Sequence, residues 1–352
     1  MANPKVIIAD TDINYIAPLQ YKFINDYFNN IDLEIITDRQ YFTEYFSRPQ
    51  NAEILIVSED LYDLSIKRHD IKNIFVMSEE ADDGSTGDLS INKLYKYTSI
   101  MEIFSEIVAK SAKELAAGAV EKKETQVILV TSACGGVGKT TVAMGLAGSL
   151  AEGYQRVLYI NASQLQNFQY LMEEKEPITA SEIYAKAINA DENFYFDVKQ
   201  ELRTEGFTYL PAFKAALLSM GISFEIYRKL ITSAKKSDEY DYIVVDTDVA
   251  FDEEKLKLID LADKVFVVTE QSLNSVQATN NFVANVNGIN ADKYVFLCNK
   301  FRTDVSNELS SPVSAVRFNI NDYIGFVDNP AELSVAELGK NQDIKKISFL
   351  VM

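Results

Sequence analysis

Residues 133–141 read ACGGVGKTT and follow the apolar run VILVT at 127–131. A buried strand that leads into paired glycines, then into Lys-Thr and a helix, has the parts of a phosphate-binding loop. Glycines let the backbone turn its N–H groups inward, and the N-terminus of the next helix attracts anions. The strict pattern GxxxxGK[ST] fails only at its first glycine, which is Ala133 here. The stretch therefore predicts a nucleotide site.

Each position of this loop has an expected role, with ATP and Mg²⁺ as the predicted ligands. Lys139 is expected to reach the β- and γ-phosphates, and Thr140 to place its hydroxyl on Mg²⁺. The other candidate binding residues of the loop are Cys134, Gly135, Gly136, Val137, Gly138 and Thr141. Beyond it, Val142, Leu146 and Leu150 recur at helical spacing and predict the buried stripe of a helix.

A nucleotide site also needs an acid at the end of a buried strand. The run YDYIVVDTD at 240–248 puts Asp246 at such a place, as a candidate Mg²⁺ ligand. A strand-end cap is the alternative role for Asp246. Asp248 is either the ligand of a water in a switch loop or a solvated turn acid, and the sequence leaves both open.

Composition narrows the function classes for this chain of 352 residues, which is long enough for two domains. The net charge of -18 argues against bulk nucleic-acid binding, since phosphates must be neutralised by a basic face. Two cysteines and one histidine cannot build a disulfide framework, a zinc site of the usual kind or a Ser-His-Asp triad. The absence of a signal region and of an 18-residue apolar run predicts a cytoplasmic protein.

Short apolar runs alternate with helical patterns, which predicts an α/β fold with two parallel-sheet domains. A first domain is expected at 1–117, a linker at 118–126 and a second domain at 127–352. The expected strands of the first domain are 5–10, 33–37, 53–58, 73–78 and 93–97. Its closing helix is expected to begin after Ser99, a candidate N-cap.

Two stretches of the second domain have more than one interpretation. The aromatic-rich residues 193–213 are either a partner surface or a hairpin packed on the core. The end of the sequence, NQDIKKISFLVM, is short and its apolar residues are poorly segregated. We therefore expect a last core element there instead of an amphipathic membrane anchor.

The motifs GGVGKTT, YIVVDTD and VFLCNK resemble those of the MinD/ParA class of deviant Walker-A ATPases, over essentially all of 127–352. The resemblance implies ATP bound between two subunits, with a signature lysine that reaches across the dimer from the position of Cys134. It also implies an Asp-x-Asp pair for Mg²⁺ and the attacking water, where this chain has Asn161 and Ser163. Asn299 matches the residue that reads adenine, and 324–327 falls where backbone groups complete that pocket.

These departures all fall on the hydrolytic side of the expected site. A cation supplied in trans to phosphoryl transfer is worth roughly 10³–10⁵ in rate in GTPases, and a neutral thiol cannot supply it. Asn161 and Ser163 can hold a water but carry no carboxylate to polarise it. We therefore expect tight Mg·ATP binding with slow or absent hydrolysis, and treat Asn161, Ser163 and Asp248 only as candidate switch residues.

Residues 4–117 more weakly resemble the receiver domain of bacterial two-component systems. Asp10 and Asp12 match its acidic Mg²⁺ pair, although polar strand-end residues are the alternative. Ser78 and Lys96 match its hydroxyl and lysine positions. Ser58 stands where the phosphoacceptor aspartate is required, so acyl-phosphate chemistry is not expected and we interpret the domain as a pseudo-receiver.

A degenerate receiver ahead of a MinD/ParA-like ATPase is the arrangement of the TadZ/CpaE family. That resemblance implies an ATP-dependent homodimer, formed through the ATPase domain, that positions Tad (Flp-type) pilus machinery. Its partners would be other pilus-assembly proteins, bound through the receiver-like domain, and its place the cell pole or the inner face of the membrane. The alternative is a cycling MinD-like ATPase that positions a division or flagellar apparatus at the membrane.

Overall fold

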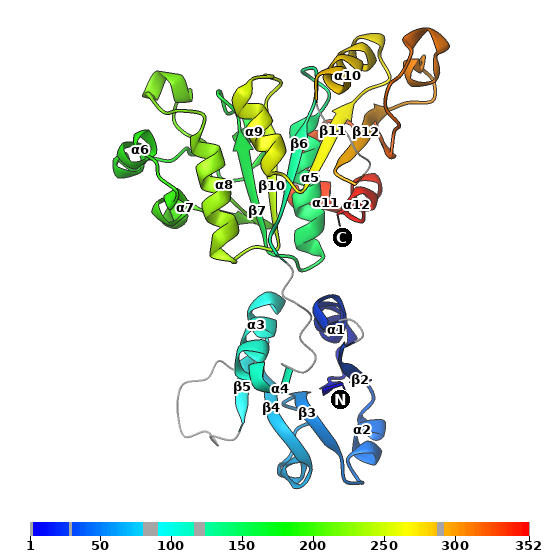
Figure 1. Ribbon diagram of the computed structural model, residues 1–352. Helices are drawn as coiled ribbons and strands as arrows, with labels where there is room; N and C mark the ends of the chain where they lie inside the picture. The colour runs from blue at the N-terminus through cyan, green and yellow to red at the C-terminus, as the bar shows by residue number, and fades with distance from the viewer. Residues whose placement is uncertain (1–2, 28–29, 80–90, 116–123, 287–291, 352) are drawn as a thin grey trace. The chain divides into compact units, whose positions relative to one another are not determined.

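A computed structural model of the chain describes residues 3–27, 30–79, 91–115, 124–286 and 292–351. The chain divides into two compact units, Met1–Lys123 and Glu124–Met352. Each is built on one β sheet with helices on both faces (Figure 1). Most of the linker expected at 118–126 lies outside the described residues, and Gln126 already belongs to a strand.

The first unit has a five-stranded parallel sheet of order β2-β1-β3-β4-β5. Its strands are β1 (Lys5–Ala9), β2 (Asp32–Ile36), β3 (Asn51–Ser58), β4 (Asp70–Ser78) and β5 (Asn92–Tyr95). Its helices are α1 (Ile13–Tyr27), α2 (Arg39–Tyr45), α3 (Ile100–Lys110) and α4 (Ala112–Leu115). The expected cap is confirmed, because the Ser99 side chain accepts a hydrogen bond from Glu102 N.

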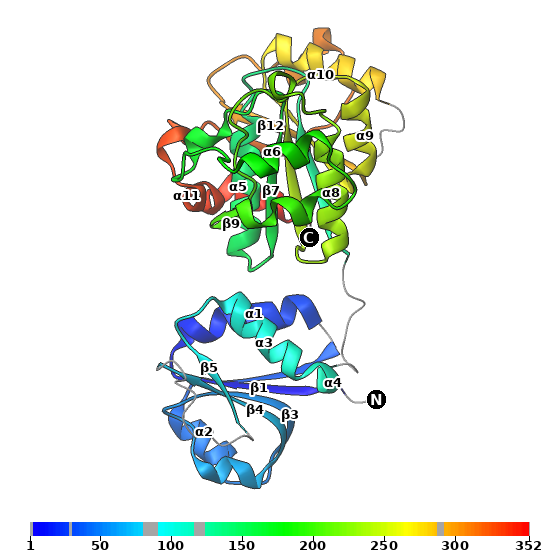
Figure 2. The same cartoon turned by 90° about the vertical axis from the view of Figure 1, so that its left-hand side faces the viewer.

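Alternate residues of each strand enter different cores, as the period of two in a β-strand requires. Val6 and Ile8 of β1 pack with α1 and α3 on one face of the sheet. Ile7 and Ala9 pack with α2 on the other face. Figure 2 shows α1 and α3 on one side of the strands and α2 on the opposite side. Strands buried on both faces explain the all-apolar runs of the sequence.

The second unit has an eight-stranded sheet of order β13-β12-β11-β6-β10-β7-β9-β8, parallel except for the β8–β9 pair. The strands are β6 (Gln126–Thr131), β7 (Val157–Ala162), β8 (Arg203–Glu205), β9 (Phe207–Tyr209), β10 (Tyr242–Thr247), β11 (Lys264–Thr269), β12 (Tyr294–Phe301) and β13 (Asp322–Gly325). After β6 the chain builds one side of the sheet and then crosses to the other, with β11. Ligands of open α/β sheets bind at the carboxyl ends of the strands at such a switch point.

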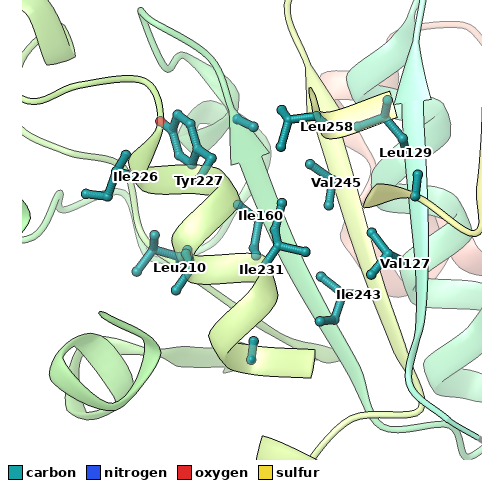
Figure 3. Close-up of a cluster of buried hydrophobic side chains, with 14 of the residues drawn as sticks. Val127, Leu129, Ile160, Leu210, Ile226, Tyr227, Ile231, Ile243, Val245 and Leu258 are labelled. Carbon is teal, nitrogen blue, oxygen red and sulfur yellow. The ribbon is translucent and has the colours of Figure 1, made fainter. Parts of the chain in front are cut away.

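Helices cover both faces of this sheet. They are α5 (Lys139–Glu152), α6 (Ser181–Ile188), α7 (Phe194–Val198), α8 (Ile226–Ser237), α9 (Glu253–Leu261), α10 (Leu273–Asn285), α11 (Val335–Lys340) and α12 (Gln342–Ser348). Figure 3 shows Ile231 of α8 next to Ile160 and Ile243 of the strands. The other face carries α5, α11 and α12. Packing of helices on both faces thereby fixes the positions of β6, β10 and β11.

Helix α5 is more buried than its sequence pattern predicts. Val142, Leu146 and Leu150 are buried as expected, but so is every residue between Val142 and Leu150. The reason is that α11 and α12 pack against α5 in addition to the strands. At the closest point, a Cβ on Gly339 would lie 2.7 Å from Gly148 C. The helix is therefore enclosed, not half-exposed.

The two ambiguous stretches of the second unit both join its core. Within 193–213, Phe207 and Tyr209 are buried, and β8 and β9 form a hairpin at the sheet edge. At the C-terminal end, Ile344 and Ile347 are 1% and 0% exposed in the core beneath α5. The interpretation of that end as a core element is confirmed. Among the described residues, no helix is long and apolar enough to cross a membrane.

Candidate functional site

The loop that follows β6 has the backbone shape of a phosphate cradle. Gly136 and Gly138 have φ of 80° and 82°, in the left-handed region that glycine adopts without strain. Gly138 is the N-cap of α5, which begins at Lys139. A Cβ on Gly138 would lie 2.4 Å from Asn299 Nδ2, so the Asn299 side chain would have to move away from the loop. Positive φ thus explains Gly136 and Gly138, and the short distance to Asn299 is a second reason for glycine at 138.

Asp246 lies at the end of β10, beside the loop, and is 1% exposed. Its Oδ2 accepts hydrogen bonds from Thr140 Oγ1 at 2.8 Å, Tyr159 OH at 3.0 Å and Asn161 Nδ2 at 2.7 Å. Burial raises the pKa of Asp246, while the Thr140 hydrogen bond and the charge of Lys139 lower it. The structure therefore brings together the two residues predicted to hold the metal, Thr140 and Asp246.

The arrangement of these groups fits Mg²⁺. Asp246 Oδ1 is buried, and no described residue bonds to it. Three donors fix the other oxygen, so the carboxylate is oriented with one oxygen left for a ligand. Mg²⁺ is usually bound by one or two protein oxygens together with water and substrate phosphates. In the described ranges, no cluster of three or more His, Cys, Asp or Glu side chains could hold a metal ion.

Lys139 stands where an anion would be bound. It begins α5 directly after the glycine loop. Burial lowers the pKa of Lys139, and the nearby charge of Asp246 opposes that effect. A half-buried ammonium that lacks full solvation gains from a phosphate brought close to it.

Cys134 is directed at a hydroxyl cluster of its own chain. Its Sγ donates to Ser275 Oγ at 3.3 Å, and Ser275 Oγ lies 2.9 Å from Thr269 Oγ1. Thr279 Oγ1 donates to Thr269 Oγ1 at 3.0 Å, which completes the cluster. The side chain at the signature position thus makes an internal contact and brings no positive charge to the loop.

Of the three candidate switch residues, Asn161 contacts Asp246, whereas Ser163 and Asp248 hydrogen-bond to other residues. Asn161 is the register partner of Asp246 on β7, and its amide is used to hold that carboxylate. Ser163 is 8% exposed. Asp248 Oδ1 accepts from Ala250 N at 3.0 Å, the contact of an Asx turn, which favours its role as a turn acid.

Lys255 is a buried lysine that sequence reasoning missed. Its side chain is 2% exposed, and its Nζ donates to Asp248 O at 2.7 Å and Thr131 Oγ1 at 3.4 Å. Burial lowers the pKa of Lys255 to about 8, against the raising effect of Asp248. Lys255 shares the inward face of α9 with Leu258 and Ile259, and this i, i+3, i+4 spacing could have revealed it.

A cavity of about 210 Å³ lies next to Lys255. It is bounded by the start of the phosphate loop (131–133), the loop after β10 (249–251) and helix α10. Its apolar walls include Phe251 and Phe282. The cavity joins the two loops that border the candidate site.

Two consecutive residues of β12 hold the phosphate loop from its other side. Asn299 Nδ2 donates to Val137 O at 2.8 Å. Lys300 Nζ donates to Gly136 O at 2.5 Å and pairs with Glu270 Oε1 at 3.0 Å. The residue predicted to read adenine is therefore at the loop, and β13, which contains the first part of 324–327, pairs with the same strand. Lys300 was not predicted, although it stands next to Asn299 in LCNK.

The first unit brings its predicted polar residues to the carboxyl ends of β1, β3, β4 and β5. Asp10 Oδ2 pairs with Lys96 Nζ at 2.7 Å, and the Asp10 side chain is 2% exposed. Ser78 Oγ donates to Glu59 Oε2 at 2.6 Å. Ser58 is buried, and no described residue hydrogen-bonds to its hydroxyl. The lysine thus neutralises an acid that a receiver would use for metal.

The sequence of the second unit is similar to one protein family model and to several curated proteins. Residues 125–297 match the sequence model of a family described as AAA domain. The septum site-determining protein MinD of Synechocystis sp. is 25% identical over 183 residues, which cover 51% of this chain and 66% of that protein. MinD of Escherichia coli K12 is 27% identical over 157 residues, 43% of this chain and 55% of that protein. The chain thus spans less than two thirds of the length of these curated relatives.

Solved structures give the same answer for the fold. A ParA family ATPase from Chlorobium tepidum matches with a TM-score of 0.53 and 17% identity, over 64% of this chain and 98% of that one. A chain of the MinC:MinD cell division protein complex of Aquifex aeolicus matches with a TM-score of 0.50 and 19% identity, over 65% and 96%. The second unit therefore has the fold of a MinD/ParA-type P-loop ATPase.

Proposed function

We propose that this chain is an ATP-binding localisation and assembly factor for Tad (Flp-type) pilus machinery, which acts as an ATP-dependent homodimer with slow or absent hydrolysis. The contact between Thr140 and Asp246, with its unpartnered buried oxygen, carries the nucleotide part of the proposal. The pilus role is supported by the order of the units. A parallel sheet of order 2-1-3-4-5, the order of CheY-like folds, precedes the ATPase unit.

Slow hydrolysis follows from what surrounds the phosphate site. Cys134 supplies no cation and faces Ser275 of its own chain. Asn161 uses its Nδ2 to hold Asp246, and its unpartnered Oδ1 is a neutral acceptor without the carboxylate charge that would polarise an attacking water. The proposed binding groups are the loop amides, Lys139, Thr140 and Asp246, and a hydrogen bond joins the last two. Mg²⁺, when bound, would neutralise phosphate charge at this place.

Nucleotide identity and assembly state test this function directly. Mass spectrometry of nucleotide extracted from purified protein is expected to find ATP or ADP. Light scattering is expected to give a monomer without nucleotide and a dimer with Mg·ATP. A monomer with no nucleotide under both conditions contradicts the proposal, as does multiple turnover of several ATP per second without a partner.

The pilus role has its own experiment in the source organism. Deletion of the gene is expected to remove surface pili, as counted by electron microscopy. Wild-type protein is expected to restore them, and Asp246→Ala to fail at a matched cellular level. Normal piliation in the deletion strain would contradict the role while leaving nucleotide binding unaffected.

A cycling MinD-like ATPase is the second candidate, because the curated relatives are named MinD. It predicts binding to a membrane that depends on ATP. Flotation with vesicles of phosphatidylethanolamine, phosphatidylglycerol and cardiolipin distinguishes the two functions. Flotation only with Mg·ATP, together with turnover stimulated by the vesicles, would favour the cycling enzyme over the assembly factor.

A further inference from the structure

Lys300 lies beside the phosphate loop because of an irregularity in β12. Cys298 pairs with Tyr323 and Phe301 pairs with Gly325, so β12 has one residue more than β13 between these pairs. Lys300 in this bulge has φ of 54°, in the left-handed region that a lysine rarely adopts. Bulges next to functional sites redirect side chains.

The bulge allows two neighbouring side chains to reach the same loop. In a regular strand, consecutive residues point to opposite faces of the sheet. Here Asn299 Nδ2 bonds to Val137 O and Lys300 Nζ bonds to Gly136 O. Both residues of the bulge therefore hold consecutive carbonyl groups of the glycine loop, an arrangement that we call the Asn299–Lys300 clamp.

Holding these carbonyls also orients the N–H groups of the loop. In a planar trans peptide, C=O and N–H point in opposite directions. The carbonyl of Gly136 shares its peptide with the N–H of Val137, and that of Val137 with the N–H of Gly138. Both N–H groups are thereby turned away from β12, and no described residue accepts a hydrogen bond from them. They remain available to an anion.

Lys300 also brings a positive charge to the glycine pair from within the chain. Its ammonium lies 3.0 Å from Glu270 Oε1, and the lysine side chain is 39% exposed. Glu270 follows β11, so the ion pair joins both strands on this side of β6 to the loop. The ammonium contacts Gly136, which is two residues after Cys134. Residues 134–136 of the loop carry no positive charge of their own.

We propose that Lys300 is a positioning residue for nucleotide binding, which fixes the phosphate loop in its anion-binding shape through Gly136 O. The inference rests on the proposed nucleotide binding and extends it to a residue with no expected role. The left-handed backbone is maintained because it places the ammonium on the loop. Strained residues of this kind cluster at ligand clamps.

Substitution at Lys300 separates this role from a structural one. Lys300→Gly adopts φ of 54° without strain, and Lys300→Asn tolerates it, so both are expected to unfold at or above the wild-type urea midpoint. Calorimetric titration with Mg·ADP and with Mg·ATP is expected to show about tenfold weaker binding of both, the size of one charged hydrogen bond. Lys300→Arg, which keeps a donor and a charge, is expected to bind within about threefold of wild type.

Lys236→Ala is the charge-matched control, because Lys236 is exposed at the end of α8. It is expected to bind both nucleotides like the wild type. Wild-type affinity in Lys300→Gly and Lys300→Asn would overturn the proposal and leave nucleotide binding intact. Wild-type protein that binds neither nucleotide would overturn both. Weaker binding in Lys300→Arg equal to that of Lys300→Gly would also count against the ammonium contact.

Discussion

At the residue scale, Asn161 puts an amide beside Asp246 in place of a second carboxylate. The class that the second unit resembles has a carboxylate at this position, yet here an amide donates to Asp246 Oδ2 at 2.7 Å. An aspartate at 161 would put two carboxylates at hydrogen-bond distance in a buried place. Like charges at that distance cannot both be ionised without a cation between them.

We expect Asn161→Asp to lower the free energy of unfolding by about 3 kcal/mol without metal, because a buried charge is left unpaired. Mg²⁺ is expected to restore much of this loss by lying between the carboxylates. Thermal unfolding with and without Mg²⁺ measures both effects. Asn161→Ala is the control, with a loss of about 1 kcal/mol that does not depend on Mg²⁺. Equal unfolding of Asn161→Asp with and without Mg²⁺ would contradict the expectation.

Lys255 gives the molecule a pH dependence of a definite sign. Its folded-state pKa is about 8, lowered by burial from an ordinary 10.5. Between these values the unfolded chain binds a proton that the folded chain does not, so the free energy of unfolding increases with pH across this window. Below pH 8 Lys255 is protonated in both the folded and the unfolded state. The whole unfavourable free energy of burying the ammonium then lowers the free energy of unfolding.

Lys255→Met is therefore expected to raise the free energy of unfolding at pH 7 by about 1–3 kcal/mol, and to change it little at pH 10. Urea unfolding of both proteins at pH 7, 8.5 and 10 tests this. Titration of other groups, the tyrosines included, cancels in the difference between the two proteins. A difference that stays constant with pH would show that Lys255 keeps its proton throughout.

At the scale of elements, the sequence predicts some features of the site and not others. The glycine loop, Lys139, Thr140 and Asp246 follow from local patterns, because strand, turn and helix are each encoded within a few residues. Lys300 could not be found this way, since its place depends on a bulge formed between strands. Local patterns also underestimated the burial of α5, because α11, which packs against it, is distant from α5 in the sequence.

The crossing of α5 and α11 depends on two glycines. A Cβ on Gly148 would lie 2.8 Å from Val335 O, which is backbone and cannot rotate away. Gly148→Ala is expected to lower the free energy of unfolding by about 1–3 kcal/mol. Gly145→Ala on the same helix meets only the flexible Ile344 side chain, at 2.7 Å, and is expected to cost less. Urea unfolding measures both, and equal stabilities of the two variants would contradict this account.

At the scale of the whole molecule, the chain has two units with separate hydrophobic cores. The predicted α/β class with two parallel sheets agrees with what is observed, because alternating apolar runs and helical patterns report sheet class reliably. The linker boundaries remain a prediction. The roles of the receiver-like unit and of the pilus partners also remain predictions, since neither depends on the nucleotide site.

Separate cores predict that nucleotide stabilises one unit and not the other. Calorimetry is expected to show two unfolding transitions, of which Mg·ATP raises only that of Glu124–Met352. At 100 times Kd the gain is about 2.7 kcal/mol. Asp246→Ala is expected to lower this gain and leave the other transition unchanged. A single transition, or two that shift together, would show that the units unfold as one.

Helix α5 packs against the sheet and against both α11 and α12, with glycine at its closest approach to α11. A helix held in this way cannot slide or rotate, because a shift of one residue would place a side chain where only glycine fits. Any movement that accompanies nucleotide exchange must therefore occur in the loops after β6, β7 and β10. The floor of the site would then stay fixed, and the proposed nucleotide would change only the loops above it.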